Sequence, residues 1–214
     1  MQKSILIIGA GTGLSLGVAQ KFGEQGYKVG LISRNADNLE KLSQELKAKN
    51  IDCFYTTADV KNATELQQAI TDLRSILGEI NTLFYNAAHL KMQNILDEAP
   101  ETLTDDFMIN VVGAQQAFKL LYPDLQKQKG AMLIAGGGLA FYPSPDLGSL
   151  AIGKAAIRNL ALQLNAIGKE KGIYVGIINI TGRIEPESLK HSPEILAEKF
   201  WKLNSDRTLT EETY

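Results

Sequence analysis

The sequence is poor in the residues that form covalent or metal cross-links. Cys53 is its only cysteine, and His89 and His191 are its only histidines. A lone cysteine excludes an internal disulfide and suits a reducing cytoplasm. The two histidines lie far apart in the sequence and share no ligand spacing with the cysteine, so we expect no metal site.

The sequence also lacks a charge excess and a long apolar run. Its 214 residues carry a formal net charge of −2, which favours binding to neither nucleic acid nor an anionic membrane. The apolar run Ser4–Ile8 is too short to span a membrane and has no cleavage signal. We therefore expect a cytoplasmic protein with neither a nucleic-acid nor a membrane partner.

Short apolar runs alternate along the chain with longer helical patterns, which begin near Leu14, Ala36, Asn62, Pro100 and Leu147. Continuous apolar strands are typical of a parallel sheet that is covered on both faces. The alternation predicts an α/β fold with a doubly wound parallel sheet and right-handed crossovers, and no linker divides residues 1–214 into two domains. The expected strands are Ser4–Ile8, Lys28–Ser33, Asp52–Thr57, Thr82–Asn86, Ala131–Ala135 and Tyr174–Ile180.

Residues 183–214 form a short C-terminal segment that could lie on the substrate side or only pack. Ser192 and Pro193 are typical of a helix N-cap and first helical residue. The helix would carry Phe200 and Trp201, which could close a pocket, contact a partner subunit or belong to the core. The final "TLTEETY" is either a short edge strand or frayed.

The first strand ends in the glycine-rich turn "GAGTGLSLG", which runs from Gly9 to Gly17. Such a turn lets backbone N–H groups approach a pyrophosphate at a helix N-terminus. Ser15 stands where a third glycine is usual, and its hydroxyl could donate to a phosphate. A tight turn without any ligand is the alternative. The predicted contacts are Gly9, Gly11, Thr12, Gly13, Leu14 and Ser15.

The second strand lacks an acidic residue at its end. An acid there would bind the ribose 2′-hydroxyl of NAD, but Ser33 and Arg34 occupy the place. A guanidinium can donate two N–H groups to a phosphate, so we expect NADP(H) to be preferred over NAD(H). Alternatively, Arg34 is a solvated charge at the start of a helix.

With these features the chain resembles the short-chain dehydrogenase/reductase family over about residues 3–182. "ADV" resembles the family's adenine-contacting turn, "YNAA" its Asn-Asn-Ala-Gly signature, and "NITGRI" the turn after the sixth strand. Lys154 matches the lysine of Tyr-x-x-x-Lys and Asn110 the active-site asparagine. The further matching positions are Asp59, Val60, Asn86, Ala87, Thr181 and Gly182.

The resemblance implies a Rossmann fold with strand order 3-2-1-4-5-6, a nicotinamide cofactor and a small-molecule substrate. Family members are often dimers or tetramers, and the short tail disfavours the tetramer contact between final strands. A homodimer through helices 101–121 and 151–167 is the expectation. Lys154 would bind the nicotinamide ribose and Asn110 would hold a water, although an exposed lysine and a structural hydrogen bond are the alternatives.

The sequence departs from the family at the residues that carry the chemistry. Leu150 stands where the family has its tyrosine, and Gly137 or a neighbouring glycine stands where it has its serine. Leucine cannot be a general acid. Tyr142, in the loop after the fifth strand, is our predicted replacement, although it could simply pack on the loop. A water, Ser144, Ser149 and His89 are the remaining alternatives.

The glycines Gly136–Gly138 leave room where a substrate would bind, and we expect their amides to face the crevice rather than bulk solvent. The sequence thus predicts an NADP(H)-dependent oxidoreductase for a small carbonyl or alcohol, with a non-standard proton donor. A non-catalytic NADP(H)-binding redox sensor or regulatory protein is the alternative.

Overall fold

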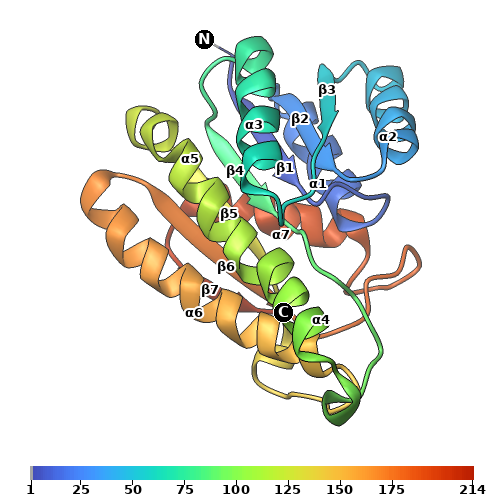
Figure 1. The fold of residues 1–214 in the computed structure, drawn as a ribbon. Helices are drawn as coiled ribbons and strands as arrows, with labels where there is room; N and C mark the ends of the chain where they lie inside the picture. Colours follow the sequence, from blue (N-terminus) through green and yellow to red (C-terminus); the bar gives the residue numbers. More distant parts are fainter. Residues whose placement is uncertain (1) are drawn as a thin grey trace.

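A computed structural model describes residues 2–214 as one α/β unit with a seven-stranded, fully parallel sheet (Figure 1). The strand order is β3-β2-β1-β4-β5-β6-β7, which confirms the predicted Rossmann order and adds one edge strand. The strands are β1 (Ser4–Ile8), β2 (Lys28–Ser33), β3 (Cys53–Thr57), β4 (Thr82–Tyr85), β5 (Ala131–Gly137), β6 (Tyr174–Ile180) and β7 (Glu211–Thr213).

Helices cover both faces of the sheet, so the strands are apolar on both sides (Figure 1). Helices α3 (Ala63–Leu77), α5 (Gly113–Lys127) and α6 (Gly148–Lys171) enclose one core with the sheet. Helices α1 (Leu14–Glu24), α2 (Ala36–Ala48) and α7 (Pro193–Asp206) enclose the other. No helix within residues 2–214 combines the length and the apolar character that a membrane span requires.

Local sequence signals start several helices where they were expected. The Asn62 side chain accepts hydrogen bonds from the backbone N–H groups of Thr64 and Glu65 at the start of α3. Ser192 accepts from the Ile195 N–H, and Pro193 is the first residue of α7. The helix expected near Leu147 begins one residue later, at Gly148.

Three strand boundaries differ from the prediction. β3 begins at Cys53 rather than Asp52, β4 ends at Tyr85, and β5 continues through Gly136 to Gly137. The extension of β5 follows from its pairing with β6, since Gly136 lies opposite Asn179 and Gly137 opposite Ile180. An added Cβ on Gly136 would lie 2.2 Å from the Asn179 Oδ1 atom, so the close approach requires glycine there.

The C-terminal segment does both of the things expected of it, because Arg183 and Ile184 line a pocket while α7 packs on the sheet. In α7, Phe200 is fully buried and its ring centroid lies 4.9 Å from that of Phe84, while Trp201 packs edge-on against Phe22 of α1 at 5.1 Å. Phe200 therefore belongs to the core, whereas Trp201 remains partly exposed. Residues near the C-terminus form the edge strand β7, and the carbonyl of Tyr214, just after it, accepts a hydrogen bond from the Thr181 N–H.

One irregular segment places a site residue. Helix α4 (Pro100–Phe107) continues into α5 through a π-helical turn at Met108–Val112. The buried Tyr85 hydroxyl at the end of β4 donates a hydrogen bond of 2.6 Å to the Ile109 carbonyl inside this turn. Burial raises the pKa of this phenol, so it remains a neutral donor. Turns of this kind are frequent at functional sites, and Asn110 lies in this one.

Candidate active site

Two pockets lie along the carboxyl edge of the sheet, where ligands bind in folds of this class. The smaller, about 250 Å³, lies between the ends of β1, β2 and β4, and we call it the β2-side pocket. The larger, about 730 Å³, lies over the ends of β5 and β6, and we call it the β5-side pocket. Asn86 lines both.

The glycine-rich turn connects the two pockets. Gly9 lines the β2-side pocket, and Leu14, five residues later, lines the β5-side pocket. Gly9 has φ +86°, and an added Cβ would lie 2.3 Å from the Ala87 backbone nitrogen. By contrast, a Cβ on Gly11 or Gly13 would meet no atom within 4 Å, so the backbone is open there. The turn thus offers an accessible backbone between two hollows.

The N-terminus of α1 at this turn has free capacity for an anion. Gly13 caps the helix without a side-chain hydrogen bond, and no acidic residue occupies the first turn. The first N–H groups of a helix have no partner within it, and the helix dipole favours a negative charge there. The turn therefore fits a pyrophosphate.

Ser15 has a different role from the one considered above. It is buried, and its hydroxyl donates to the Gly9 carbonyl at 2.8 Å while it accepts from the Asn86 Nδ2 group at 2.9 Å. The hydroxyl proton is therefore engaged inside the protein and does not face a phosphate. Ser15 instead ties the end of β4 to the glycine turn.

The β2-side pocket gathers the residues expected around an adenosine. Ser33 and Arg34 follow β2, and within residues 2–214 the Arg34 guanidinium has no carboxylate within 4.0 Å. No acidic side chain ends β2, so a 2′-phosphate would meet a cation. Sequence reasoning missed Asn35, Asn38 and Ile109, which also line this pocket and belong to no recognisable motif. Its predicted members are Gly9, Ser33, Arg34, Asp59, Val60, Asn86 and Ala87.

The β5-side pocket contains Lys154, Tyr142, Thr181 and Gly182, as predicted. The triplet Gly136–Gly138 also lines it, so these glycines face the crevice rather than bulk solvent. Most of the other walls are apolar, and the described lining includes no carboxylate. The apolar walls are formed by Leu14, Leu90, Leu139, Leu147, Leu150, Ile180 and Ile184.

Lys154 is partly buried on α6 and is not a freely solvated surface residue. Its Nζ donates a hydrogen bond of 2.9 Å to the Ala135 carbonyl on β5. Its stem lies along Gly137, where an added Cβ would touch the lysine Cγ, Cδ and Cε atoms at 3.3 Å. Removal from water disfavours the charged form and lowers the pKa of Lys154 to about 8.

Asn110 is buried beside this helix and is only half satisfied. Its Oδ1 accepts a hydrogen bond of 3.0 Å from the His89 backbone N–H. Its Nδ2 group has no partner among the described residues, and an added Cβ on Gly153 of α6 would lie 2.6 Å from it. The Asn110 side chain therefore has one hydrogen-bond partner, the His89 N–H, and its Nδ2 group is left as a donor.

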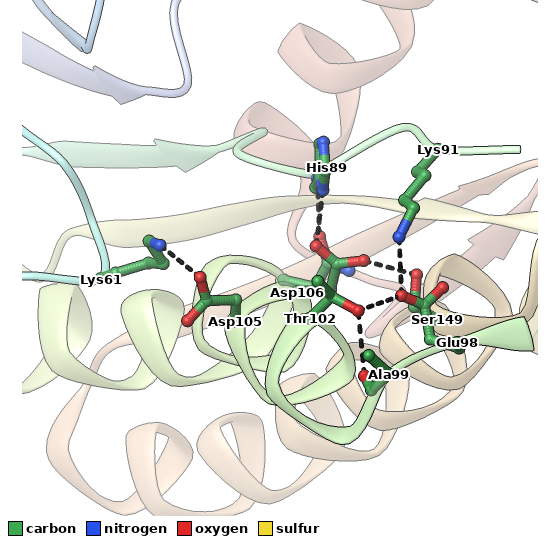
Figure 2. A network of polar contacts seen from close by, with 10 residues as sticks. Lys61, His89, Lys91, Glu98, Ala99, Thr102, Asp105, Asp106 and Ser149 are labelled. Carbon is green, nitrogen blue, oxygen red and sulfur yellow. Dashed lines mark hydrogen bonds and ion pairs between the residues drawn. The ribbon is translucent and has the colours of Figure 1, made fainter. Parts of the chain in front are cut away.

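A buried carboxylate binds two of the alternative acids (Figure 2). Asp106 of α4 lies 2.5 Å from the His89 Nδ1 atom through Oδ1, and its Oδ2 accepts a hydrogen bond of 2.6 Å from Ser149. His89 lines a separate hollow with Arg34 and Lys61, not the β5-side pocket. The alternatives in which His89 or Ser149 supplies the acid therefore do not agree with the structure.

Sequence reasoning missed Asp106, because an acid in an amphipathic helix usually indicates a solvated face. Tyr142, the predicted acid, lies at the mouth of the β5-side pocket with 77% of its surface exposed.

Comparisons with known proteins agree with this geometry. The family model described as short chain dehydrogenase matches residues 3–193. Oxidoreductase UcpA of Salmonella typhimurium is 29% identical over 178 residues, which is 82% of this chain and 67% of UcpA. The 3-oxoacyl-[acyl-carrier-protein] reductase FabG of Staphylococcus epidermidis is 28% identical over 181 residues, which is 78% of this chain and 74% of FabG.

Solved structures share the whole fold at lower identity. An alcohol dehydrogenase of Thermococcus sibiricus, complexed with 5-hydroxy-NADP, has a TM-score of 0.88 at 18% identity and covers 100% of this chain and 95% of its own. An actinorhodin polyketide ketoreductase with NADPH has a TM-score of 0.90 at 16% identity and covers 99% and 95%. Because the family model matches most of this chain, the chain belongs to the short-chain dehydrogenase family, whose members bind nicotinamide cofactors.

Proposed function

We propose that the protein is an NADP(H)-dependent oxidoreductase acting on a small carbonyl or alcohol, with a proton donor other than the family's tyrosine. The observation that carries this proposal is the continuous edge of two pockets joined by the glycine turn. Unpaired Arg34 lies at one end and the partly buried Lys154 at the other. This arrangement suits a dinucleotide whose adenosine end lies in the β2-side pocket.

The residues present fit the cofactor. Arg34 would bind the 2′-phosphate, the backbone from Gly9 to Gly13 the pyrophosphate, and Lys154 the nicotinamide ribose. Asp59 and Val60 line the adenosine end, and Thr181 and Gly182 the nicotinamide end. When bound, the reduced nicotinamide supplies a hydride. NADP complexes among proteins of the same fold agree with this preference.

The substrate would occupy the remainder of the β5-side pocket. Its apolar walls suit a carbonyl compound with an apolar substituent, and the open backbone at Gly136–Gly138 leaves room for it. The side chains at this pocket that can carry a charge are Tyr142, Lys154 and Arg183. Leu150 fills the usual place of the acid but cannot give a proton.

Exposed apolar side chains fit the expected dimer. Phe107, at the end of α4, and Ile152 and Ile167 on α6 are apolar yet 38%, 43% and 53% exposed. They fall on or beside the helical segments expected to form the subunit contact, so we propose a homodimer through them.

The cytoplasmic location that we expect agrees with the buried Cys53, which is the only thiol of the chain.

A non-catalytic NADP(H)-binding regulator is the second candidate. It is favoured by the joint replacement of the family's tyrosine by Leu150 and of its serine by Gly137 or a neighbouring glycine. It does not explain why Lys154 lines an apolar pocket that is large enough for a substrate.

Calorimetric titration of the purified protein with NADPH and with NADH tests the proposal first. We expect tight binding of NADPH and much weaker binding of NADH, followed by NADPH oxidation with some members of a carbonyl panel. NADPH binding without turnover across the panel would favour the regulator. Failure to bind either nucleotide would contradict both candidates.

A further inference from the structure

We infer that Lys154 itself donates the proton to the substrate carbonyl, in place of the missing tyrosine. This inference rests on the proposed reductase function. It assigns to the lysine a direct chemical step in addition to its expected contact with the nicotinamide ribose.

The position of Lys154 supports the assignment. Leu150 and Lys154 are one helical turn apart on α6 and line the same pocket, so the lysine follows the empty acid position on the same helix face. The absence of a side chain at Gly137 lets the lysine stem lie against β5. The glycine thus leaves room for the lysine stem, and Leu150 offers no competing acid beside it.

The other titratable side chains near the pocket are less suitable donors. Arg183 is paired with Glu185 at 2.9 Å, and a guanidinium is too weak an acid to serve as a proton donor. The Tyr142 ring lies mostly in solvent at the pocket mouth. His89 and Ser149 are both bound to Asp106.

Most walls of the pocket around the amine are apolar, and Arg183 is the other cationic side chain in its described lining. The Ala135 carbonyl accepts a hydrogen bond from the amine, Gly137 lies along the lysine stem, and the described lining includes no carboxylate. Arg158, one turn further along α6, is paired with Glu211 of β7. Desolvation alone lowers the pKa of Lys154 to about 8, close to the pH at which a general acid works best.

An ammonium has three N–H donors, which is enough for both roles. One donates to the Ala135 carbonyl, and two remain for a ribose hydroxyl and the substrate oxygen. In reduction, the carbonyl carbon takes a hydride with its electron pair from the reduced nicotinamide, which is oxidised. The carbonyl oxygen takes a proton from the Lys154 ammonium, and the neutral amine regains a proton from water.

The first test needs neither cofactor nor substrate. Trace acylation of the protein over a range of pH, followed by mass spectrometry, measures when each amine becomes nucleophilic. We expect Lys154 to react with a midpoint near pH 8. The exposed Lys169 on the same helix is the reference amine. A Lys154 midpoint near the ordinary lysine value of about 10.4 would overturn the inference.

The second test separates proton donation from cofactor binding. Lys154→Arg keeps a cation for the ribose but holds its proton too tightly to act as an acid. We expect NADPH affinity within about threefold of wild type by calorimetry, and turnover lower by about 10²–10⁴-fold. A plot of the wild-type kcat/KM against pH should show a descending limb near pH 8, and this limb should be absent from Lys154→Arg. Lys169→Arg should keep the limb.

The outcomes distinguish the inference from the function on which it rests. If Lys154→Arg keeps turnover and the limb, or if Tyr142→Phe removes the limb, the donor is not Lys154 although the reductase function stands. If the wild-type protein neither binds NADPH nor reduces a carbonyl, the proposed function itself is wrong.

Discussion

The two pockets at the edge of the sheet differ in how they are built. The turn at the edge of the β2-side pocket is shaped by the main chain, because Gly9 packs against the backbone of Ala87. In the β5-side pocket, the proposed chemistry depends on side chains, and Leu150 stands at the position expected for the family's tyrosine. A binding site made of backbone tolerates sequence change, whereas a proton relay changes with each side chain.

The largest expected effect is at the backbone-built end, in Gly9→Ala. The new Cβ would lie 2.3 Å from a backbone nitrogen at a residue with φ +86°. We expect the free energy of unfolding to fall by about 3 kcal/mol and NADPH binding to be lost. Urea denaturation and calorimetry measure both, with Gly11→Ala as the matched control because its Cβ would meet open space. Equal losses in the two variants would contradict the structure.

Arg34→Ala should act on one cofactor only. Loss of the guanidinium removes its charge-assisted hydrogen bonds to the 2′-phosphate, so we expect NADPH affinity to fall by about 10- to 100-fold. NADH, which lacks this phosphate, should bind as before. Titration of the variant with both nucleotides checks this, and a similar loss for NADH would show that Arg34 supports the fold of the pocket.

Lys154→Met should stabilise the protein while it removes the acid. The folded-state pKa of Lys154 is lowered, so burial of its charge costs stability fully below pH 8 and progressively less up to about 10.5. The variant should gain on the order of 2 kcal/mol in the free energy of unfolding at pH 7, and little at pH 10.5. Urea denaturation at both pH values tests this. A loss of stability at pH 7 would indicate that the bond to Ala135 outweighs desolvation.

Gly137→Ser gives the smallest expected change. The new Cβ would press on the Lys154 stem at 3.3 Å, so the lysine must shift by a few tenths of an ångström. We expect turnover to fall by about tenfold or less, since small misplacements of reacting groups are costly. NADPH affinity should stay close to wild type. Steady-state kinetics with parallel calorimetry measures this, and an equal loss of binding would contradict a separation between the two pockets.

Much of this architecture could be read from local sequence. The apolar runs located six strands because a doubly covered parallel sheet requires apolar residues on both faces of each strand. The capping residues Asn62 and Ser192 marked helix starts because their side chains bond nearby N–H groups. The glycine turn was recognisable from the spacing of its glycines, and Arg34 from its place at the end of the second strand.

Contacts between distant segments could not be read in this way. Ser15 bonds Gly9 and Asn86 rather than facing a phosphate, and Asp106 holds His89 and Ser149, which are 60 residues apart in the chain. The Ser15 contacts depend on how α1 meets the end of β4, and the Asp106 contacts depend on how α4 and α6 meet the loop after β4. No local pattern encodes either meeting.

The sequence by itself determined the family and the sheet and predicted a cofactor end, because these depend on periodicity, caps and a turn that needs glycine. It also determined that Leu150 cannot be an acid. Only the tertiary structure decided what remains beside that leucine. It laid the Lys154 stem on the bare backbone of Gly137 and lowered the pKa of its amine to about 8. The physical reason is that the pKa of an amine depends on the water and charges around it, and in this fold those surroundings come from β5, which is distant in the chain.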